Sequence, residues 1–408
     1  MSLRPTESAS TTTKTPRHLL GSHRMPFEPR KPSVVLLGTY PPTECGLATY
    51  TANLRGALQG RGLSARVVRL LDAGERPMSM SNNVVAVWRR GDPRGVDEAL
   101  DAARASDLVL VQHEFGIYPG RDGEEIIDFV QRCDRPIITV LHTVLEHPTP
   151  RQLGIVNDLT RASNLLVVHS AAARVRLLAV YDIDPNEVEI VPHGAQPNLT
   201  GPSTVASDEP LMLTWGLLGP GKGIEHGIEA VAILRRQGLD VRYLVAGETH
   251  PNVHAREGER YRDELVELAR CLGVADLVDF DAVYRDWKSL RAIVRSAALV
   301  LLPYDSRDQV TSGVLVEALA AGKPVVATAF PHAIELSHSG AVVVVGYEAP
   351  DRCAASIRRI LTHPRLRQAM EAAARIEGAR YNWSTIGRRF EELAVTAVDR
   401  EFESALVI

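Results

Sequence analysis

Several features that define whole classes of protein are scarce or missing in this 408-residue chain. Its four cysteines, Cys45, Cys133, Cys271 and Cys353, lie far apart and form no C-x-x-C pair. This spacing fits neither a disulfide framework nor a zinc site, and it suits a reducing compartment. No run approaches the roughly 18 consecutive apolar residues of a membrane-spanning helix. The N-terminal segment has no positively charged region followed by an apolar stretch, so we expect no signal peptide.

An excess of charge of one sign is also missing. Lys and Arg total 46 against 50 Asp and Glu, which leaves a net charge of −4. A dedicated nucleic-acid binder usually carries a basic excess, so we expect no nucleic-acid partner. The chain is 45% hydrophobic and 24% charged, as in soluble globular proteins, and we expect it to be cytoplasmic. Arg161, Arg174 and Arg176 flank helical segments and leave room for peripheral contact with the cytoplasmic face of a membrane.

Motifs for common hydrolases and metal sites are absent as well. Neither H-E-x-x-H nor G-x-S-x-G occurs, which removes the commonest metalloprotease and serine-hydrolase interpretations. Two D-x-D patterns, at 182–184 and 279–281, have no cluster of histidines or carboxylates beside them. We therefore expect no metal site and no cofactor.

What the chain does contain is a long alternation of strands and helices. Residues 1–31 are rich in Ser, Thr, Pro and basic residues and are predicted to be disordered, with Met25 as an alternative start. Beyond them, short β-branched apolar runs recur at 33–38, 65–70, 83–88, 107–112, 136–141, 164–169 and 188–192, and then at 211–216, 241–248, 278–283, 298–304, 324–329 and 341–346. Near-continuous runs of this kind are typical of strands buried on both faces of a parallel sheet. The segment 196–210 is rich in Pro, Ser, Thr and Gly, which is typical of a linker between two domains. We therefore predict an α/β fold with two Rossmann-like, doubly wound parallel-sheet domains facing a cleft.

The second domain opens with a glycine-rich loop, GLLGPGKG, at 216–223. It satisfies G-x-x-x-x-G-K, but Gly223 stands where a P-loop needs Ser or Thr for magnesium. Loop amides at a helix N-terminus still attract an anion, and Lys222 adds a positive charge. The alternative is a tight turn with a solvated lysine. The first domain opens similarly, with Gly38, Cys45 and Gly46 in a loop that would face the other one.

The segment 309–328, QVTSGVLVEALAAGKPVVAT, carries the richest pattern. A helix that begins near Thr311 would expose the amides of Thr311, Ser312 and Gly313, with Gln309 ahead of them. Glu317 stands alone among apolar residues, where an unpartnered carboxylate is costly to bury. It is either paired inside the protein or binds ligand hydroxyls.

Three histidines each follow a predicted strand of the first domain: His113, His142 and His193. A single histidine at a strand end is more often structural. Three at corresponding ends favour a site in which imidazole donates to a sugar hydroxyl or to a departing phosphate.

In order and spacing, these motifs resemble those of the retaining, nucleotide-sugar-dependent glycosyltransferases of family 4, also called glycosyl transferases group 1. The resemblance covers about residues 33–395 and rests on the segments PPTECGLATYTANL, QHEFG, TVLHT, VEIVPHG, GLLGPGKGIEHGIEAV and VTSGVLVEALAAGKPVVAT. It implies the GT-B fold, with an acceptor-side domain at 32–198 and a nucleotide-sugar domain at 199–380. It also implies that a C-terminal helix at 381–408 crosses back to the first domain.

The resemblance also implies roles for single residues. Lys222 would neutralise the leaving diphosphate with the amides around Gly221, and His113 would contact the donor sugar. Glu317 would hold the ribose hydroxyls. Catalytic roles fall to His113, Lys222 and Gln309, and substrate binding to Gly46, His142, His193, Gly221, Thr311, Ser312, Gly313, Val314 and Glu317.

Three positions depart from the family pattern. Gln309 replaces the first of two glutamates, Leu217 replaces a frequent arginine, and Cys45 replaces one of a pair of glycines. An amide still hydrogen-bonds a sugar hydroxyl, but the charge is lost. The diphosphate clamp is weaker unless Arg307 or His193 takes the place of the missing arginine.

The expected function is therefore transfer of a hexosyl unit from a nucleoside-diphosphate sugar to an acceptor hydroxyl, with retention and without a metal ion. The acceptor would be a saccharide, a lipid or a small molecule. Three alternatives stay open at this point: a P-loop NTPase, a non-catalytic two-domain sugar- or nucleotide-binding protein, and a sugar-nucleotide epimerase on the same fold.

Overall fold

The computed structural model describes residues 30–72, 82–200, 209–307 and 309–406. The predicted disordered start up to residue 29, Met25 with it, and positions 201–208 of the predicted linker lie outside these residues. From Lys31 onward the chain forms one compact unit. In the part of the chain described, no helix is long and apolar enough to cross a membrane.

The first sheet has seven strands in the order β3-β2-β1-β4-β5-β6-β7, and all neighbouring strands are parallel. They are β1 (Val34–Gly38), β2 (Ala65–Leu71), β3 (Val84–Arg89), β4 (Leu108–His113), β5 (Ile137–Leu141), β6 (Leu165–Val168) and β7 (Val188–Ile190). The strand order reverses between β1 and β4. Ligands of open α/β sheets bind beyond the carboxyl ends of strands at such a reversal.

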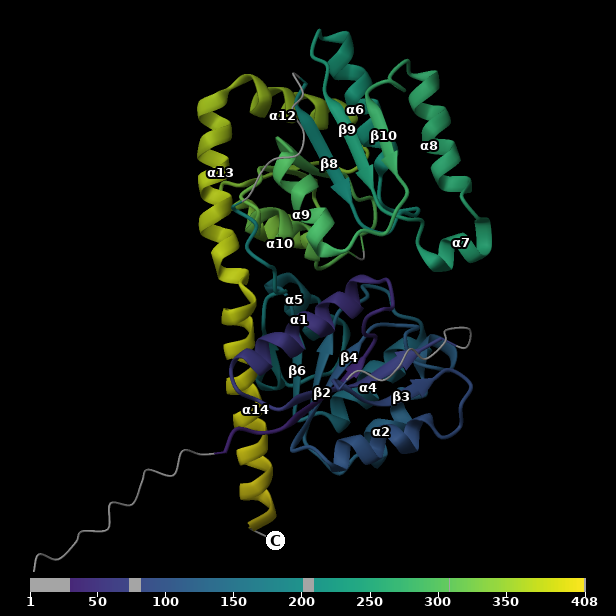
Figure 1. Cartoon of the computed structure of the whole chain (residues 1–408), viewed down its shortest axis with the longest axis vertical. Helices are drawn as coiled ribbons and strands as arrows, with labels where there is room; N and C mark the ends of the chain where they lie inside the picture. Colours follow the sequence, from purple (N-terminus) through teal and green to yellow (C-terminus); the bar gives the residue numbers. More distant parts are fainter. Residues whose placement is uncertain (1–29, 73–81, 201–208, 308, 407–408) are drawn as a thin grey trace, which may run out of the picture. The chain divides into compact units, whose positions relative to one another are not determined.

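The second sheet repeats the plan with six parallel strands in the order β10-β9-β8-β11-β12-β13. They are β8 (Leu211–Trp215), β9 (Arg242–Ala246), β10 (Val278–Asp281), β11 (Leu299–Leu302), β12 (Val325–Thr328) and β13 (Val342–Val345). Its order reverses between β8 and β11. Each of the predicted apolar runs forms one strand, and the predicted α/β fold with two parallel sheets is confirmed (Figure 1).

The helices connect successive strands or follow the last one. Those of the first half are α1 (Gly46–Gly60), α2 (Gly95–Arg104), α3 (Ile126–Arg132), α4 (Pro150–Ala162) and α5 (Ala171–Val180), with the 3₁₀ turns η1 (Arg121–Gly123) and η2 (Pro185–Glu187). Those of the second half are α6 (Ile224–Arg236), α7 (Pro251–Glu257), α8 (Arg260–Cys271), α9 (Trp287–Ser296), α10 (Gly313–Ala320), α11 (Pro331–Ser337), α12 (Pro350–Thr362), α13 (Pro364–Gly378) and α14 (Trp383–Leu406), with η3 (Ala379–Tyr381).

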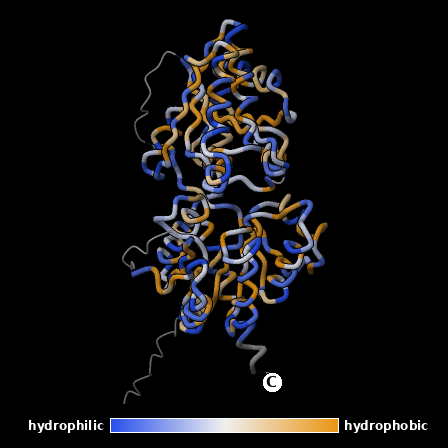
Figure 2. Tube along the Cα trace, turned by 90° about the vertical axis from the view of Figure 1, so that its right-hand side faces the viewer, coloured by the Kyte–Doolittle hydropathy of each residue, from blue (hydrophilic) through white to orange (hydrophobic). Residues whose placement is uncertain are grey.

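Both faces of each sheet are buried, which explains why the strands read as continuous apolar runs. In β1, Val34 and Leu36 point into the core under α1, whereas Val35 and Leu37 point into the core under α2 and α3. Successive side chains of a strand alternate between faces, so a strand covered on both sides needs apolar residues at every position. Figure 2 shows hydrophobic stretches of the chain inside each domain, and the strand residues are among the buried ones. Each fully buried Val or Leu contributes about 1.5–3 kcal/mol.

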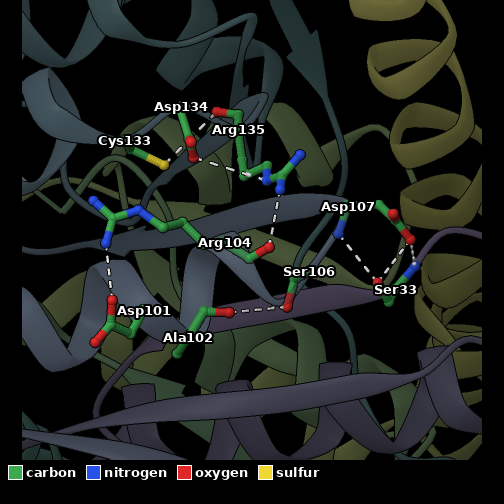
Figure 3. Close-up of polar contacts among 9 residues, drawn as sticks. All are labelled: Ser33, Asp101, Ala102, Arg104, Ser106, Asp107, Cys133, Asp134 and Arg135. Atoms are coloured by element: carbon green, nitrogen blue, oxygen red, sulfur yellow. Dashed lines mark hydrogen bonds and ion pairs between the residues drawn. The ribbon is translucent and has the colours of Figure 1, made fainter.

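Polar contacts fix the first strand in the sheet. The Ser33 backbone N–H and hydroxyl both donate to the Asp107 carboxylate, at 2.7 Å each, and the Asp107 N–H donates to the Ser33 hydroxyl at 3.1 Å (Figure 3). Ser33 precedes β1 and Asp107 precedes β4, so these bonds align the two strands at the reversal in strand order.

The last helix completes the core of the first domain. Trp383, Ile386 and Phe390 of α14 are buried with residues of β1 and α1, and α14 runs beside α1 (Figure 1). The chain passes between the domains twice, and the two passages pair with each other: the Ala195 N–H donates to the Tyr381 carbonyl at 2.7 Å. The residue limits assigned above to the domains stay a prediction.

Candidate functional site

A tight glycine turn leads from β8 into α6. Gly223, the N-cap residue of α6, has a left-handed backbone with φ 60°. A Cβ at this position would lie 1.9 Å from the carbonyl oxygen of Pro303. A side chain, and with it the Ser or Thr hydroxyl of a P-loop, therefore does not fit here without movement of the backbone. This packing argues against the P-loop NTPase alternative.

Lys222 precedes this glycine and lies over an aromatic ring. Its Nζ lies 4.5 Å from the centroid of the Tyr304 ring, and it lines a small cavity together with Trp215. Burial lowers the pKa of Lys222. In the part of the chain described, no carboxylate forms an ion pair with it. A cation held over an aromatic ring without a counter-charge is poised to attract an anionic ligand.

The N-terminus of α10 is the second positive element of the site. Ser312 is its N-cap residue, and its hydroxyl accepts the Leu315 N–H at 3.2 Å. The amides of Gly313 and Val314, the first two residues of the helix, have no intrahelical acceptor and lie at the positive end of the helix dipole. Ser312 is also close enough to the Tyr304 hydroxyl to lower its pKa against the larger effect of burial, and the Tyr304 ring lies under the Lys222 ammonium. Lys222 and the start of α10 thus border the same place.

Glu317, on the next turn of α10, is half-buried. Its Oε2 accepts the indole N–H of Trp215 at 3.3 Å. Burial raises the pKa of Glu317 to about 7, although the bond from Trp215 lowers it. No cation pairs with this carboxylate among the residues described. The sequence left open whether Glu317 is paired internally or binds ligand hydroxyls, and one neutral indole donor leaves most of its acceptor capacity unused.

Gln309 and Thr311 lie just ahead of α10. The Gln309 side-chain amide donates to the Thr311 carbonyl, which leaves the Gln309 carbonyl oxygen as its acceptor. The Thr311 hydroxyl lies 3.2 Å from the hydroxyl of Ser170 in the first domain. Gly221, in the glycine loop, has φ 88°, and its carbonyl accepts the amides of Asp305 and Ser306.

The first-domain loop ends in an exposed glycine at the start of α1. The Cys45 thiol caps α1 by accepting the Ala48 N–H at 3.3 Å. A Cβ on Gly46 would meet no atom within 4 Å. The space in front of this helix is therefore open, as the predicted approach of the loop to a phosphate requires. The Thr49 hydroxyl, one turn along, lies 3.4 Å from the Tyr284 hydroxyl of the second domain.

The predicted histidines belong to a larger aromatic cluster around Tyr50. The Tyr50 ring centroid lies 4.7 Å from that of His142, 5.0 Å from His193 and 5.2 Å from His169. His142 shares a 2.8 Å hydrogen bond with the Gln112 side-chain oxygen. Burial lowers the pKa of His193 to about 3 and that of His169 to about 4, so both rings are neutral at physiological pH. His169 was not singled out in the sequence, although it too follows a strand of this sheet.

His113 and His193 differ in whether they reach the proposed site. The His113 ring is fully buried, its pKa is lowered to about 4, and neither ring nitrogen has a hydrogen-bond partner among the residues described. Contact with a donor sugar would require its neighbours to move. His193, in contrast, reaches the start of α10: a Cβ on Gly313 would lie 3.0 Å from its Nε2. Its other nitrogen, Nδ1, lies 2.8 Å from the Gly194 carbonyl.

Of the two groups considered as replacements for the missing arginine, His193 is the better placed. Arg307 stacks on Tyr347, with 5.0 Å between the guanidinium carbon and the ring centroid. Leu217 itself lines the cavity that Lys222 borders. Most of the predicted site residues thus lie together: Gly221, Lys222, His193, Ser312, Gly313, Val314 and Glu317, with Gln309 and Thr311 beside them. Two lie apart from this group. His113 is enclosed in the first domain, and Gly46 lies on the first-domain loop.

One group of potential metal ligands escaped the sequence analysis. Glu225, His226 and Asp305 offer ligand atoms that all lie within 4.8 Å of one another. These groups already have protein partners: His226 lies 3.4 Å from Asp305 and 3.1 Å from Glu229, and Glu225 accepts the Tyr261 hydroxyl. Their distance in sequence, with Asp305 some 80 positions away, hid them from a search for short motifs.

Comparison with known proteins shows which family and which solved structures the chain resembles. Residues 196–377 match the glycosyl transferases group 1 family. A D-inositol 3-phosphate glycosyltransferase of Segniliparus rotundus is 28% identical over 263 residues, which cover 60% of this chain and 55% of that protein. An alpha-D-kanosaminyltransferase of Streptomyces kanamyceticus is 29% identical over 183 residues, or 44% of each chain. This chain therefore spans about half the length of these two relatives.

A solved structure shows the same fold over nearly the whole molecule. Anabaena HepE, crystallised with UDP and glucose, superposes with a TM-score of 0.72 and 18% identity, covering 89% of this chain and 100% of that one. Such a likeness at low identity establishes the architecture, which is the GT-B fold. With its two Rossmann-like domains in that arrangement, the chain has the GT-B architecture, and its residues 196–377 are similar to the glycosyl transferases group 1 family.

Proposed function

We propose that the protein transfers a hexosyl unit from a nucleoside-diphosphate sugar to an acceptor hydroxyl, with retention of anomeric configuration and without a metal ion. One observation carries the proposal: the Lys222 ammonium, which no carboxylate among the described residues pairs with, borders the amides of Gly313 and Val314, which have no acceptor within their helix. This is an anion site of the kind that stabilises a leaving diphosphate.

In this proposal the protein's own groups divide the work. Lys222 and the start of α10 offset the negative charge that develops on the leaving diphosphate. Glu317 accepts the ribose hydroxyls. The Gln309 amide hydrogen-bonds the donor sugar in place of a carboxylate, and His193 donates to the diphosphate in place of the missing arginine. The bond between the anomeric carbon and the diphosphate oxygen breaks, the acceptor hydroxyl oxygen forms the new bond to that carbon on the same face, and its proton passes to the departing diphosphate.

The comparisons suggest which substrates to test first. Because HepE was crystallised with UDP and glucose, UDP-glucose is the first donor, followed by GDP and ADP sugars. D-inositol 3-phosphate is the first acceptor, because a relative that aligns over 60% of this chain is named for it. We further propose the domain division at 32–198 and 199–380, with the donor on the second domain.

The experiment follows release of nucleoside diphosphate and formation of a glycosylated product, whose anomeric configuration is read by NMR. We expect turnover to persist in EDTA, which also tests the Glu225, His226 and Asp305 group. We expect Lys222→Ala to lower kcat on the order of 100-fold, as for loss of one oxyanion donor, and the exposed Lys288→Ala to leave it unchanged. Near-normal turnover in Lys222→Ala would overturn the proposal.

Other products would identify the alternatives. Release of nucleoside diphosphate without any glycosylated acceptor would indicate hydrolysis. A new sugar nucleotide formed without an acceptor would indicate an epimerase. Binding without turnover would support the non-catalytic alternative, which the missing charge at Gln309 favours.

A further inference from the structure

Helix α11 contacts the start of a helix in each domain. From one end of this helix, His332 reaches the N-terminus of α10 in the second domain. From the other end, Glu335 reaches the N-terminus of α5 in the first domain. Neither residue stands out in the sequence, because each acts on a segment distant from it in the chain.

Glu335 caps a helix of the other domain. Its Oε1 accepts the Ala171 N–H at 3.1 Å, and its Oε2 accepts the Ala172 N–H at 2.9 Å. The third amide of α5, on Ala173, donates to the N-cap residue Ser170 at 3.0 Å. All three amides of the first turn are thus satisfied, two of them by a carboxylate at the positive end of the helix. Charge-assisted bonds of this kind are about twice as strong as neutral ones.

His332 holds the N-cap residue of α10. Its Nδ1 accepts the Ser312 backbone N–H at 3.1 Å, which assigns the tautomer with Nδ1 unprotonated. His332 is buried, and burial lowers its pKa to about 4, so the ring stays neutral and keeps this acceptor at physiological pH. The same short helix therefore fixes the positions of both helix starts.

The chain just before α10 is also held by the first domain. The Val310 side chain is only 2% exposed and packs into the first-domain core with Leu141, Val144 and Leu177. The Val310 carbonyl accepts the Ser170 hydroxyl at 3.3 Å, and upstream the Arg307 carbonyl accepts Arg176 at 3.1 Å. Residues 309–314, which we call the donor segment, thus carry Gln309 and the free amides of α10 but are anchored from the other domain.

We propose that Glu335, Ser170 and Val310 are positioning residues, through which the first domain sets the geometry of the donor segment. The inference rests on the proposed function, because its consequence is expressed in transfer. Lys222, Glu317 and the start of α10 in the second domain provide most of the proposed contacts with the nucleotide, and His193 adds one from the first domain. The alignment of Gln309 with the donor sugar additionally needs the contacts with α5 and the first-domain core.

The test compares Glu335→Ala, Glu335→Gln and Ile334→Ala in the full chain. Ile334 is 54% exposed on the same helix, so its variant controls for changes to α11. We expect Glu335→Ala to lower kcat on the order of 10- to 100-fold, since small misplacements of a reacting group have effects of this size. Its Kd for UDP, GDP or ADP, whichever binds the wild type, should stay within about threefold. Glu335→Gln keeps one acceptor oxygen and should fall between Ala and wild type.

Hydrogen–deuterium exchange provides a readout that does not need turnover. Peptides covering 170–174 and 309–314 should exchange faster in Glu335→Ala than in the wild type, and those covering α6 should not. If the wild type transfers no sugar, the proposed function fails. The hydrogen–deuterium exchange of the wild type and of Glu335→Ala still shows whether Glu335 holds the donor segment in place. Wild-type kcat in Glu335→Ala, unchanged exchange at 309–314, or parallel losses of kcat, nucleotide affinity and thermal stability would each overturn the inference.

Discussion

Glu317 is expected to make nucleotide binding depend on pH near neutrality. Its carboxylate is half-buried with one indole donor, and burial raises its pKa to about 7. Ribose hydroxyls donate to an ionised carboxylate more strongly than to a carboxylic acid. Binding therefore favours the ionised form, and the affinity should fall as the pH drops through 7.

The size of the effect follows from the titration of a single group. With a pKa of about 7, roughly nine tenths of the free protein is ionised at pH 8 and one tenth at pH 6. If the complex holds only the ionised form, the Kd is about tenfold weaker at pH 6 than at pH 8, a difference of about 1.4 kcal/mol. In Glu317→Gln, which cannot ionise, this difference should vanish, and affinity at pH 8 should be lower than in the wild type.

Isothermal titration calorimetry with UDP or with uridine measures these constants at pH 6, 7 and 8. Uridine has no phosphate that titrates in this range, so it separates the protein's ionisation from that of the ligand. Binding at pH 6 should release about one proton, detected by repeating the titration in buffers of different ionisation enthalpy. An equal pH slope in the wild type and in Glu317→Gln would refute the role of this carboxylate.

The same raised pKa predicts how stability changes with pH. Folded protein keeps the Glu317 proton between about pH 4.5 and 7, where the unfolded chain releases it. The free energy of unfolding should therefore fall as the pH rises through this window, by at most about 3–4 kcal/mol. Glu317→Gln should be more stable than the wild type at pH 8 and equal to it near pH 4.5.

Two further predictions concern packing. Gly223→Ser should destabilise the protein, because the new Cβ would lie 1.9 Å from the Pro303 carbonyl oxygen. The variant should also show no magnesium-dependent ATPase activity. A stable variant that hydrolyses ATP would support the P-loop alternative. Trp383→Ala should lower the free energy of unfolding in urea by about 3–5 kcal/mol, because Trp383 is 5% exposed and packs on Tyr50. A loss below about 1 kcal/mol would show that α14 contributes little to the first-domain core.

Much of the fold could be predicted because the strands carry their own signal. A strand covered on both faces must be apolar at every position, so runs such as 299–302 and 325–328 stand out without knowledge of their neighbours. The glycine turns after β1 and β8 could also be predicted, because glycines that directly follow an apolar run indicate a turn without knowledge of distant residues. The pairing of Ala195 with Tyr381, in contrast, joins positions 186 residues apart, and no local pattern encodes it.

The site was predictable only where a residue type was unusual for its surroundings. Glu317 among apolar residues and Lys222 between glycines were such cases. Tyr304 and Trp215, which contact them, are ordinary core residues in the sequence, and only the sheet brings them together. Glu335 was hidden because helix surfaces are rich in glutamate, and its partners lie in the other domain.

The position of α14 also bears on how the protein is made. The first domain is synthesised first, yet Trp383, Ile386 and Phe390 belong to its core together with Val34 and Leu36. On the ribosome, the face of its sheet under α1 therefore stays incompletely covered while the whole second domain is being translated. The first domain reaches its final packing only after α14 has emerged. The second domain, whose sheet and covering helices are complete by residue 378, is free to finish folding earlier.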